Sequence, residues 1–260
     1  FALGDSPVAS NIDSYAFGAG AIASGTGSYA FGSVDRDIGG TTTGVKTTAS
    51  GPYSFAMGQG CTASNYISLA IGSLTTSSGR GSSAIGWYSI AQGEFATSFG
   101  PLTRSYGGAS LAIGLGDVAN SDYSTAIGTY STATGYGSTA LGLFASTNAD
   151  YSTAIGYHPY ATGMYSMALG NYTTASGESS TSMGLATTAS GSCSTALGYN
   201  TTAQCYGSLV IGRYNTTRGL LTEWNFWDPV FVIGNGSSST ITSDAMTVYK
   251  NGIADFGWFI

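Results

Sequence analysis

The chain is poor in charge and in reactive side chains. Of its 260 residues only 8% are charged, and histidine occurs once, at His158. One histidine cannot supply the converging histidine, cysteine and carboxylate groups that catalytic and metal sites use. Seven basic residues and a net charge of −6 argue against contact with nucleic acid phosphates. No apolar run is long enough to cross a membrane. We therefore expect a protein that is no enzyme, holds no cofactor or metal, binds no nucleic acid and does not insert into a membrane.

Cysteine is also scarce, with Cys61, Cys193 and Cys205 as the three instances. Three residues make no disulfide framework. Cys193 and Cys205 lie in successive repeat units, so a bridge between them stays open. The favoured interpretation is that all three are small neutral residues filling repeat positions.

Glycine, by contrast, is abundant and regularly placed. The unit alanine–apolar residue–glycine recurs every fourteen residues, except that one step, from Gly32 to Gly58, is twelve residues longer. The repeat glycines are Gly4, Gly18, Gly32, Gly58, Gly72, Gly86, Gly100, Gly114, Gly128, Gly142, Gly156, Gly170, Gly184, Gly198 and Gly212. A fixed period sustained along most of a chain indicates a repeat architecture in which each unit packs against its neighbours.

Each unit contains two strand-like halves. Serine usually stands four residues before the repeat glycine, alanine two before, and an apolar residue directly before. A second glycine lies at the midpoint, as in Ala133-Thr134-Gly135, where Asn11 and Asn65 can replace it in a left-handed turn. Two glycines per fourteen residues exclude a coiled coil. Alternation of small and larger residues predicts strands, and glycine after each strand predicts a tight turn with positive φ. The predicted fold is all-β, a narrow parallel β-solenoid of about fifteen 14-residue coils.

The small residues fit only a narrow interior, so the apolar residue before each glycine should point outward. Stacked at the spacing of β-strands, these residues would form a stripe about 70 Å long. Soluble monomers do not normally expose so much apolar surface, and a closed homo-oligomer is the commonest way to cover it. We expect the interface to include Ile71, Ile85, Ile113, Ile127, Leu141, Ile155, Leu169, Leu197 and Ile211.

The repeat resembles a known family. Ser124-Thr125-Ala126-Ile127-Gly128, followed by Thr132-Ala133-Thr134-Gly135, is similar to the head repeats of trimeric autotransporter adhesins. The resemblance implies a left-handed parallel β-roll, a homotrimer, and an extracellular adhesive fibre whose partner is a host-surface protein or glycan. Similar repeats occur in trimeric fibres of bacteriophages and other viruses. The family's neck motif, heptad stalk and membrane anchor are not found in this sequence.

The end of the chain departs from the repeat. We divide the chain into a β-roll head, residues 1–219 with an inserted loop near 33–45, and a cap or connector, residues 220–260. The segment 228–252 resembles parts of tail-fibre-like surface proteins, which keeps a virion tail fibre as an alternative. Glu223-Trp224-Asn225-Phe226-Trp227 is expected to cap the last coil.

Two groups of residues are candidates for a ligand surface, and a third group is a candidate calcium site. Asp35, Arg36 and Asp37 stand in the inserted loop, where function often resides. Tyr123, Tyr151 and Tyr165 share one turn position, and they either bind glycan or stack on one another, stacking being favoured. The acidic residues Glu94, Asp122, Asp150 and Glu178 stand 28 residues apart. This spacing is too wide for a shared calcium ion and is better explained by avoidance of stacked like charges.

Overall fold

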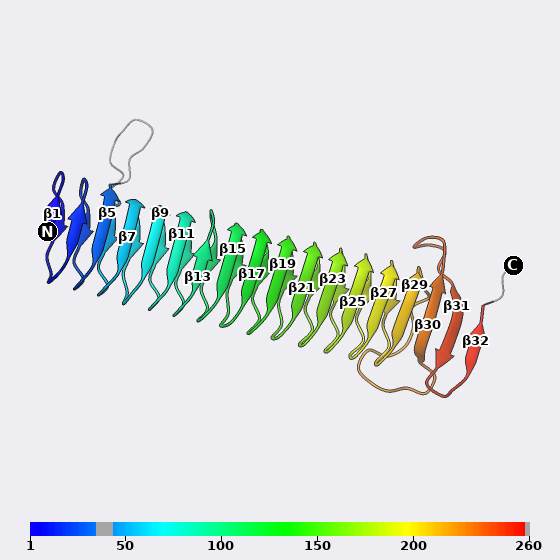
Figure 1. Ribbon diagram of the computed structural model, residues 1–260. Coiled ribbons are helices and arrows are strands. Elements are labelled where there is room, and N and C mark those ends of the chain that lie inside the picture. Colours follow the sequence, from blue (N-terminus) through cyan, green and yellow to red (C-terminus); the bar gives the residue numbers. More distant parts are fainter. Residues whose placement is uncertain (35–43, 258–260) are drawn as a thin grey trace. The chain divides into compact units, whose positions relative to one another are not determined.

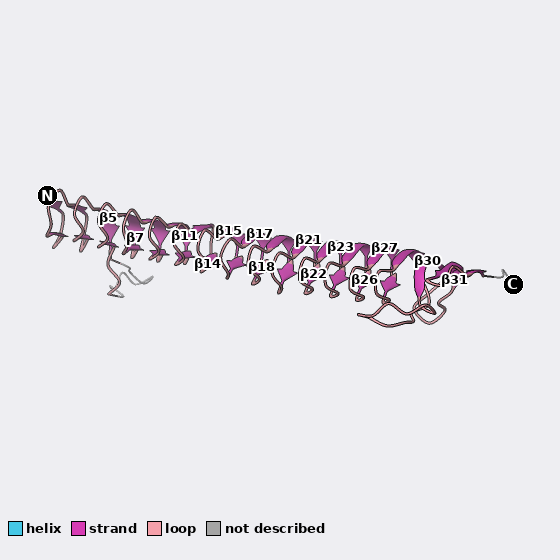
Figure 2. Ribbon diagram, turned by 90° about the horizontal axis from the view of Figure 1, so that it is seen from below, coloured by secondary structure: helices cyan, strands magenta, loops and turns pink. Residues whose placement is uncertain are grey.

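A computed structural model describes residues 1–34 and 44–257 (Figure 1). Contacts divide the chain into two units, Phe1–Tyr130 and Ser131–Ile260, which are described in turn. In both units each coil supplies one strand to a long-strand sheet and one to a short-strand sheet, on opposite sides of the coil (Figure 2). The described ranges contain no helix that could span a membrane.

In the first unit the long-strand sheet consists of β1 (Ala2–Leu3), β3 (Tyr15–Phe17), β5 (Tyr29–Ser33), β7 (Phe55–Gln59), β9 (Leu69–Ser73), β11 (Ser83–Trp87), β13 (Thr97–Phe99), β15 (Leu111–Leu115) and β17 (Thr125–Thr129). Its short-strand sheet consists of β2 (Val8–Ala9), β4 (Ile22–Ala23), β6 (Thr48–Ala49), β8 (Thr62–Ala63), β10 (Thr76–Ser77), β12 (Ile90–Ala91), β14 (Arg104–Ser105) and β16 (Val118–Ala119).

In the second unit the long-strand sheet consists of β19 (Thr139–Leu143), β21 (Thr153–Tyr157), β23 (Met167–Asn171), β25 (Thr181–Leu185), β27 (Thr195–Tyr199), β29 (Leu209–Arg213), β30 (Pro229–Asn235), β31 (Asp244–Tyr249) and β32 (Ala254–Phe256). Its short-strand sheet consists of β18 (Thr132–Ala133), β20 (Ser146–Thr147), β22 (Tyr160–Ala161), β24 (Thr174–Ala175), β26 (Thr188–Ala189) and β28 (Thr202–Ala203).

Neighbouring coils pair in parallel and in repeat register. In β9 and β11, for example, Ile71 lies opposite Ile85 and Gly72 opposite Gly86. Because the register step equals the sequence period, every repeat position forms a row along its unit. The predicted narrow parallel β-solenoid is confirmed.

The interior is as narrow as the small residues predict. Ala84, Ala126 and Ala154, each two residues before a repeat glycine, are fully buried. Hydroxyl groups bridge the two strands of a coil, as where Ser77 Oγ lies 2.6 Å from Ser82 Oγ. Small side chains therefore fill the space between the sheets, and the larger residues beside them face outward.

A tight turn leads into each long strand, at a position we call corner 1, the residues six and five before the repeat glycine. Ser82 closes one such turn, since its N–H and its Oγ both donate to the Gly79 carbonyl, at 3.2 and 2.7 Å. The residue with positive φ is the third of the four turn residues, as in a type II turn, and Tyr123 (φ 58°) is one example. The expectation that Asn65 itself is left-handed is therefore wrong, because Ile67, two residues later, has a φ of 53°. Asn65 instead donates from Nδ2 to the Ser78 carbonyl at 3.0 Å, which links it to the next coil.

Both glycines of a coil are required by close approach to the next coil, since a Cβ atom at Gly72 would collide with the Gly86 carbonyl oxygen. Gly72 also has a φ of +133°, which side chains rarely adopt, so the predicted positive φ is confirmed there. The predicted tight turn at this glycine is wrong, because Gly72 lies within β9. The midpoint glycine Gly79 has no positive φ and is required by close approach alone. A Cβ atom at Gly79 would collide with the carbonyl oxygen of Gly93 in the next coil.

At the C-terminal end the long-strand sheet continues beyond the last fourteen-residue unit. β30 pairs in parallel with β29, with Val210 opposite Val232 and Gly212 opposite Gly234. β31 and β32 then add antiparallel strands. One further repeat-like strand thus follows an excursion of the chain. The division at residue 219 remains a prediction.

Candidate assembly face and corner rows

The apolar residues before the repeat glycines point out of the solenoid. All nine predicted interface residues lie on the outer face of the long-strand sheet, half-buried or exposed in the single chain. In the first unit they are Ile71, Ile85, Ile113 and Ile127, and in the second Leu141, Ile155, Leu169, Leu197 and Ile211. Ile155 and Leu197 are 40% and 42% exposed, although both stand in central strands. The predicted orientation of the row is therefore confirmed, and its role as an interface remains a prediction.

The same face carries further apolar side chains beside that row. Ile233 of β30 extends it opposite Ile211, a member that the fourteen-residue spacing could not reveal. Trp87 and Leu115, one residue after a repeat glycine, are 50% and 36% exposed. Threonine stands beside the row at other outward positions, as at Thr125 and Thr153, so the row itself is the apolar feature of the face.

The outer face of the short-strand sheet differs between the two units. In the second unit Thr174, Thr188 and Thr202 lie side by side in β24, β26 and β28, and Tyr160 stands at the same position in β22. In the first unit Ile22, Ile90 and Val118 occupy this position in β4, β12 and β16, and Arg104 occupies it in β14. This face is therefore largely polar in the second unit and mixed in the first.

Corner 1 places the three candidate tyrosines on the surface. Tyr123, Tyr151 and Tyr165 have φ between 56° and 58° and are 60%, 49% and 56% exposed. The rings of Tyr151 and Tyr165 stack with 5.3 Å between centroids and 5° between planes. A sugar would stack on the face of an aromatic ring, and in this pair each ring covers one face of its neighbour.

The opposite turn, corner 2, consists of the two residues after each repeat glycine, and it contains His158. The imidazole is stacked between Phe144 at 4.7 Å and Tyr172 at 5.0 Å, centroid to centroid. Its ring faces are therefore covered by aromatic rings. In the part of the chain that the structure describes, no group of three histidine, cysteine or acidic residues could hold a metal ion.

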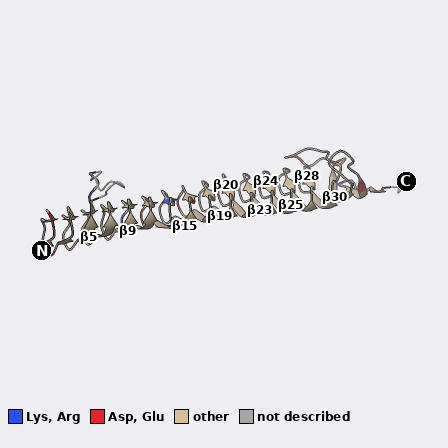
Figure 3. Ribbon diagram, turned by 90° about the horizontal axis from the view of Figure 1, so that it is seen from above, with Lys and Arg blue, Asp and Glu red and all other residues tan. Residues whose placement is uncertain are grey.

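The acidic residues at corner 1 bind the preceding coil. Asp122 Oδ1 accepts the Gly108 N–H at 2.7 Å, and Asp150 Oδ1 accepts the Tyr136 N–H at 2.8 Å. Glu94 pairs with Arg80 at 3.3 Å. Charged residues are otherwise sparse along the coils (Figure 3). These carboxylates serve as local caps for backbone donors or pair with a neighbouring cation.

Two remaining candidates have different outcomes. Asp35, Arg36 and Asp37 fall outside the described residues, so their role stays a prediction. The cysteines are free thiols, with Cys193 exposed and Cys205 buried, so the open Cys193–Cys205 bridge is not formed.

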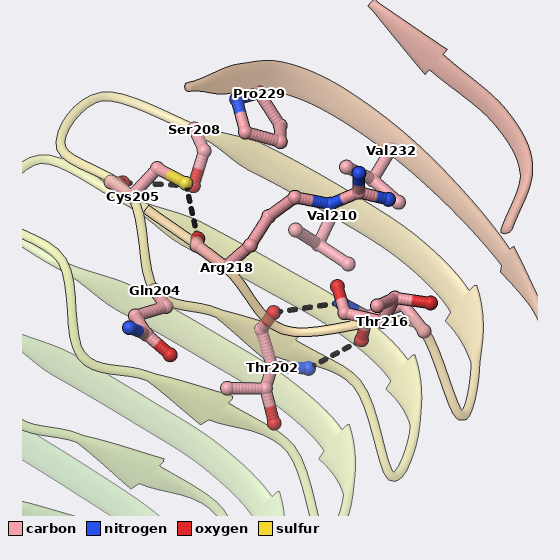
Figure 4. A pocket seen from close by; sticks show the side chains of 10 residues that line it. Thr202, Gln204, Cys205, Ser208, Val210, Thr216, Arg218, Pro229 and Val232 are labelled. Atoms are coloured by element: carbon pink, nitrogen blue, oxygen red, sulfur yellow. Dashed lines mark hydrogen bonds between the residues drawn. The ribbon is translucent and has the colours of Figure 1, made fainter. Parts of the chain in front are cut away.

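Cys205 lies beneath the segment that closes the last coil. Its Sγ donates to the Arg218 carbonyl at 2.7 Å in a small pocket lined also by Val210 and Val232 (Figure 4). Burial, with a smaller contribution from the Asp228 carboxylate, raises the pKa of the thiol to about 11. The thiol is therefore neutral and poorly nucleophilic at physiological pH.

The same segment closes the short-strand sheet with a side chain. Asn215 is 4% exposed, and its Oδ1 accepts the Thr202 N–H at 2.7 Å while its Nδ2 donates to the Thr202 carbonyl at 2.9 Å. The side-chain amide of Asn215 thus makes the hydrogen bonds that the backbone of a further short strand would make. The fourteen-residue pattern does not reveal this role of Asn215, because the residue occupies a repeat position normally filled by serine, threonine or alanine.

Comparison with known proteins agrees with this geometry. No curated protein matches the chain. A protein-family model described as the YadA head domain repeat (2 copies) matches residues 9–33, 43–60, 63–89, 119–145, 133–158, 161–187, 175–201 and 189–214. These matches cover more than half of the chain and coincide with the regular coils, so the chain belongs to the YadA head repeat family.

Proposed function

We propose that the chain forms a homotrimer through the outer face of the long-strand sheet and serves as the head of an extracellular adhesive fibre. The observation that carries the proposal is the outward row of isoleucine, leucine, methionine and phenylalanine before the repeat glycines. Three such rows meeting around an axis would leave water, and burial of apolar surface contributes roughly 25 cal/mol per Å². Membership of an adhesin-head family supports the same arrangement.

Light scattering on the purified protein tests the assembly. We expect the mass of three chains, and no stable folded monomer at ordinary concentrations. Ile127→Asp would place three like charges at the axis and abolish the trimer. Val118→Asp, on the outer face of the short-strand sheet, is the matched control and should leave the trimer intact. A compact monomer of the unaltered chain would contradict the proposal.

The proposed role is attachment without catalysis. The described side chains bring no nucleophile, base and orienting group together, whereas the repeated coils present long rows of identical positions. The partner would be a protein or glycan on a host surface. Binding of the trimer to host cells, measured before and after treatment with protease or with glycosidases, would identify the class. If the trimer binds every cell type only weakly, and neither treatment changes that binding, the result would argue against attachment.

A further inference from the structure

At corner 1 the outward side chains of successive coils form a row, and we call the position of each coil in this row a rung. One rung has no side chain. The position six residues before the repeat glycine is occupied, in successive coils, by Tyr66, Arg80, Glu94, Gly108 and Asp122. The corners stack directly, since the Phe95 N–H donates to the Arg80 carbonyl at 2.8 Å and the Ala109 N–H to the Glu94 carbonyl at 2.7 Å. At Gly108 the row has no side chain. A notch opens there, lined by Glu94, Phe95, Gly108, Ala109, Asp122 and Tyr123.

Two aromatic rings wall this notch. Phe95 and Tyr123 are 59% and 60% exposed and stand two coils apart, on either side of the small residue Ala109. Two coils correspond to about 9.6 Å. A cation midway would lie about 5 Å from both rings, within the reach of roughly 6 Å over which cation–π attraction acts.

Two carboxylates stand on either side of the missing rung. The hydrogen bond from the Gly108 N–H fixes Asp122 over the floor of the notch through Oδ1. Glu94 stands on the other side and meets Arg80 at 3.3 Å through Oε1. A cation inside the notch would therefore face the Asp122 carboxylate and would share the Glu94 carboxylate with Arg80.

The row itself shows how a cation fits at such a rung. Arg80, two rungs earlier, places its guanidinium 5.8 Å from the centroid of the Tyr66 ring while it pairs with Glu94. An aromatic ring on one side and an acid on the other thus already hold one guanidinium in this chain. The rung at Gly108 has acids on both sides and ring walls, and no cation of its own.

We propose that this notch binds an arginine side chain of a partner polypeptide. Arginine suits it better than lysine, because a planar guanidinium can stack on a ring and bind a carboxylate with two N–H groups. The site lies within one chain and one unit, so its test does not depend on trimer formation.

Saturation-transfer NMR at low salt with the peptide acetyl-Ala-Arg-Ala-amide tests the site. We expect transfer to the guanidinium methylene protons, and a decrease of at least about fivefold in the double variant Glu94→Gln/Asp122→Asn. The same peptide with citrulline, which is neutral and of nearly the same shape, should give little signal. Equal signals from the arginine and citrulline peptides, or no effect of the double variant, would overturn the proposal.

A second variant fills the rung from within. A Cβ atom at Gly108 would meet Asp122 Oδ1 at 3.4 Å, an ordinary contact, so a side chain can be added there. Gly108→Arg should abolish peptide binding and raise the melting temperature above that of the matched variant Gly108→Gln. Unaltered peptide binding by Gly108→Arg would place the site elsewhere. Putrescine, a free diamine, is the last control. If it gives a signal as strong as that of the peptide, the notch does not select an arginine side chain of a polypeptide.

Discussion

In most coils the long strand contributes five residues and the short strand two, and both line the same interior of alanine, serine and threonine. Outside, the two sheets differ. The long-strand sheet carries a row of isoleucine, leucine, methionine and phenylalanine before the repeat glycines, with threonine at many positions beside it, and at its C-terminal end it gains β30, β31 and β32. The short-strand sheet presents threonine in many strands and isoleucine or valine in several strands of the first unit, so it has no unbroken apolar row in the described coils. It ends at β28, where Asn215 satisfies its edge. The interior thus determines the coil, and the outer faces determine what the coil can contact.

The largest effect is expected from overfilling the shared interior. Ala126→Leu in the long-strand sheet and Ala119→Leu in the short-strand sheet should each prevent folding, because overpacking costs about 1–3 kcal/mol even in cores with room to adjust. Circular dichroism and thermal unfolding measure the loss. Thr125→Leu is the control, since Leu111 already occupies the equivalent outward position. If Ala119→Leu folds normally, the interior is not equally narrow beneath both sheets.

The next prediction compares the outer faces within one coil. Ile85 of β11 and Ile90 of β12 are both half-buried in the single chain. If the long-strand face is buried in a trimer, Ile85→Thr should destabilise each chain by about 1–1.5 kcal/mol, whereas Ile90→Thr should change its stability by less than about 0.5 kcal/mol. Urea unfolding at matched concentration separates the two. Equal effects would mean that neither face is preferentially covered.

Much of this architecture could be predicted from the sequence. The glycine spacing revealed the coil, and the small residues at alternate positions revealed which face lies inside. Asn215 and β30 could not be found in this way, because the step from Gly212 to Gly234 breaks the period and one amide stands in for a strand. The left-handed residue at corner 1 was also misplaced. Residues as different as Ile67 and Tyr123 accept this φ, and both donate their N–H to a carbonyl of the preceding coil, so residue type does not reveal the position.

A more local effect is expected where the short-strand sheet ends. Asn215→Leu would leave the N–H and carbonyl of Thr202 without their partners, at a cost of about 1–3 kcal/mol. Faster hydrogen exchange at the Thr202 amide should accompany a lower melting temperature. Asn171→Leu is the control, because Leu185 occupies the same position in the next coil. Unchanged exchange at Thr202 would show that the amide does not close the sheet.

The smallest effect concerns the thiol beneath that closure. The folded state raises the pKa of Cys205 from 9.0 to about 11. The folded state therefore holds the proton more tightly, so this stabilisation is complete below pH 9 and is lost as pH rises from 9 to 11. Cys205→Ala should flatten that part of the pH dependence of unfolding. At pH 8, iodoacetamide should modify exposed Cys193 and spare Cys205. Rapid labelling of Cys205 in the folded protein would contradict its burial.

The two places where the period breaks show where this fold accepts added sequence. The longer step between Gly32 and Gly58 leaves the two glycines paired in register, and so does the step between Gly212 and Gly234. The first excursion begins after β5, at corner 2, and the second returns through corner 1 to β30. Strands tolerate no such additions, because one extra residue would turn every inward alanine outward. The corners are therefore natural grafting points, where a foreign loop could be displayed without a change to the coils on either side.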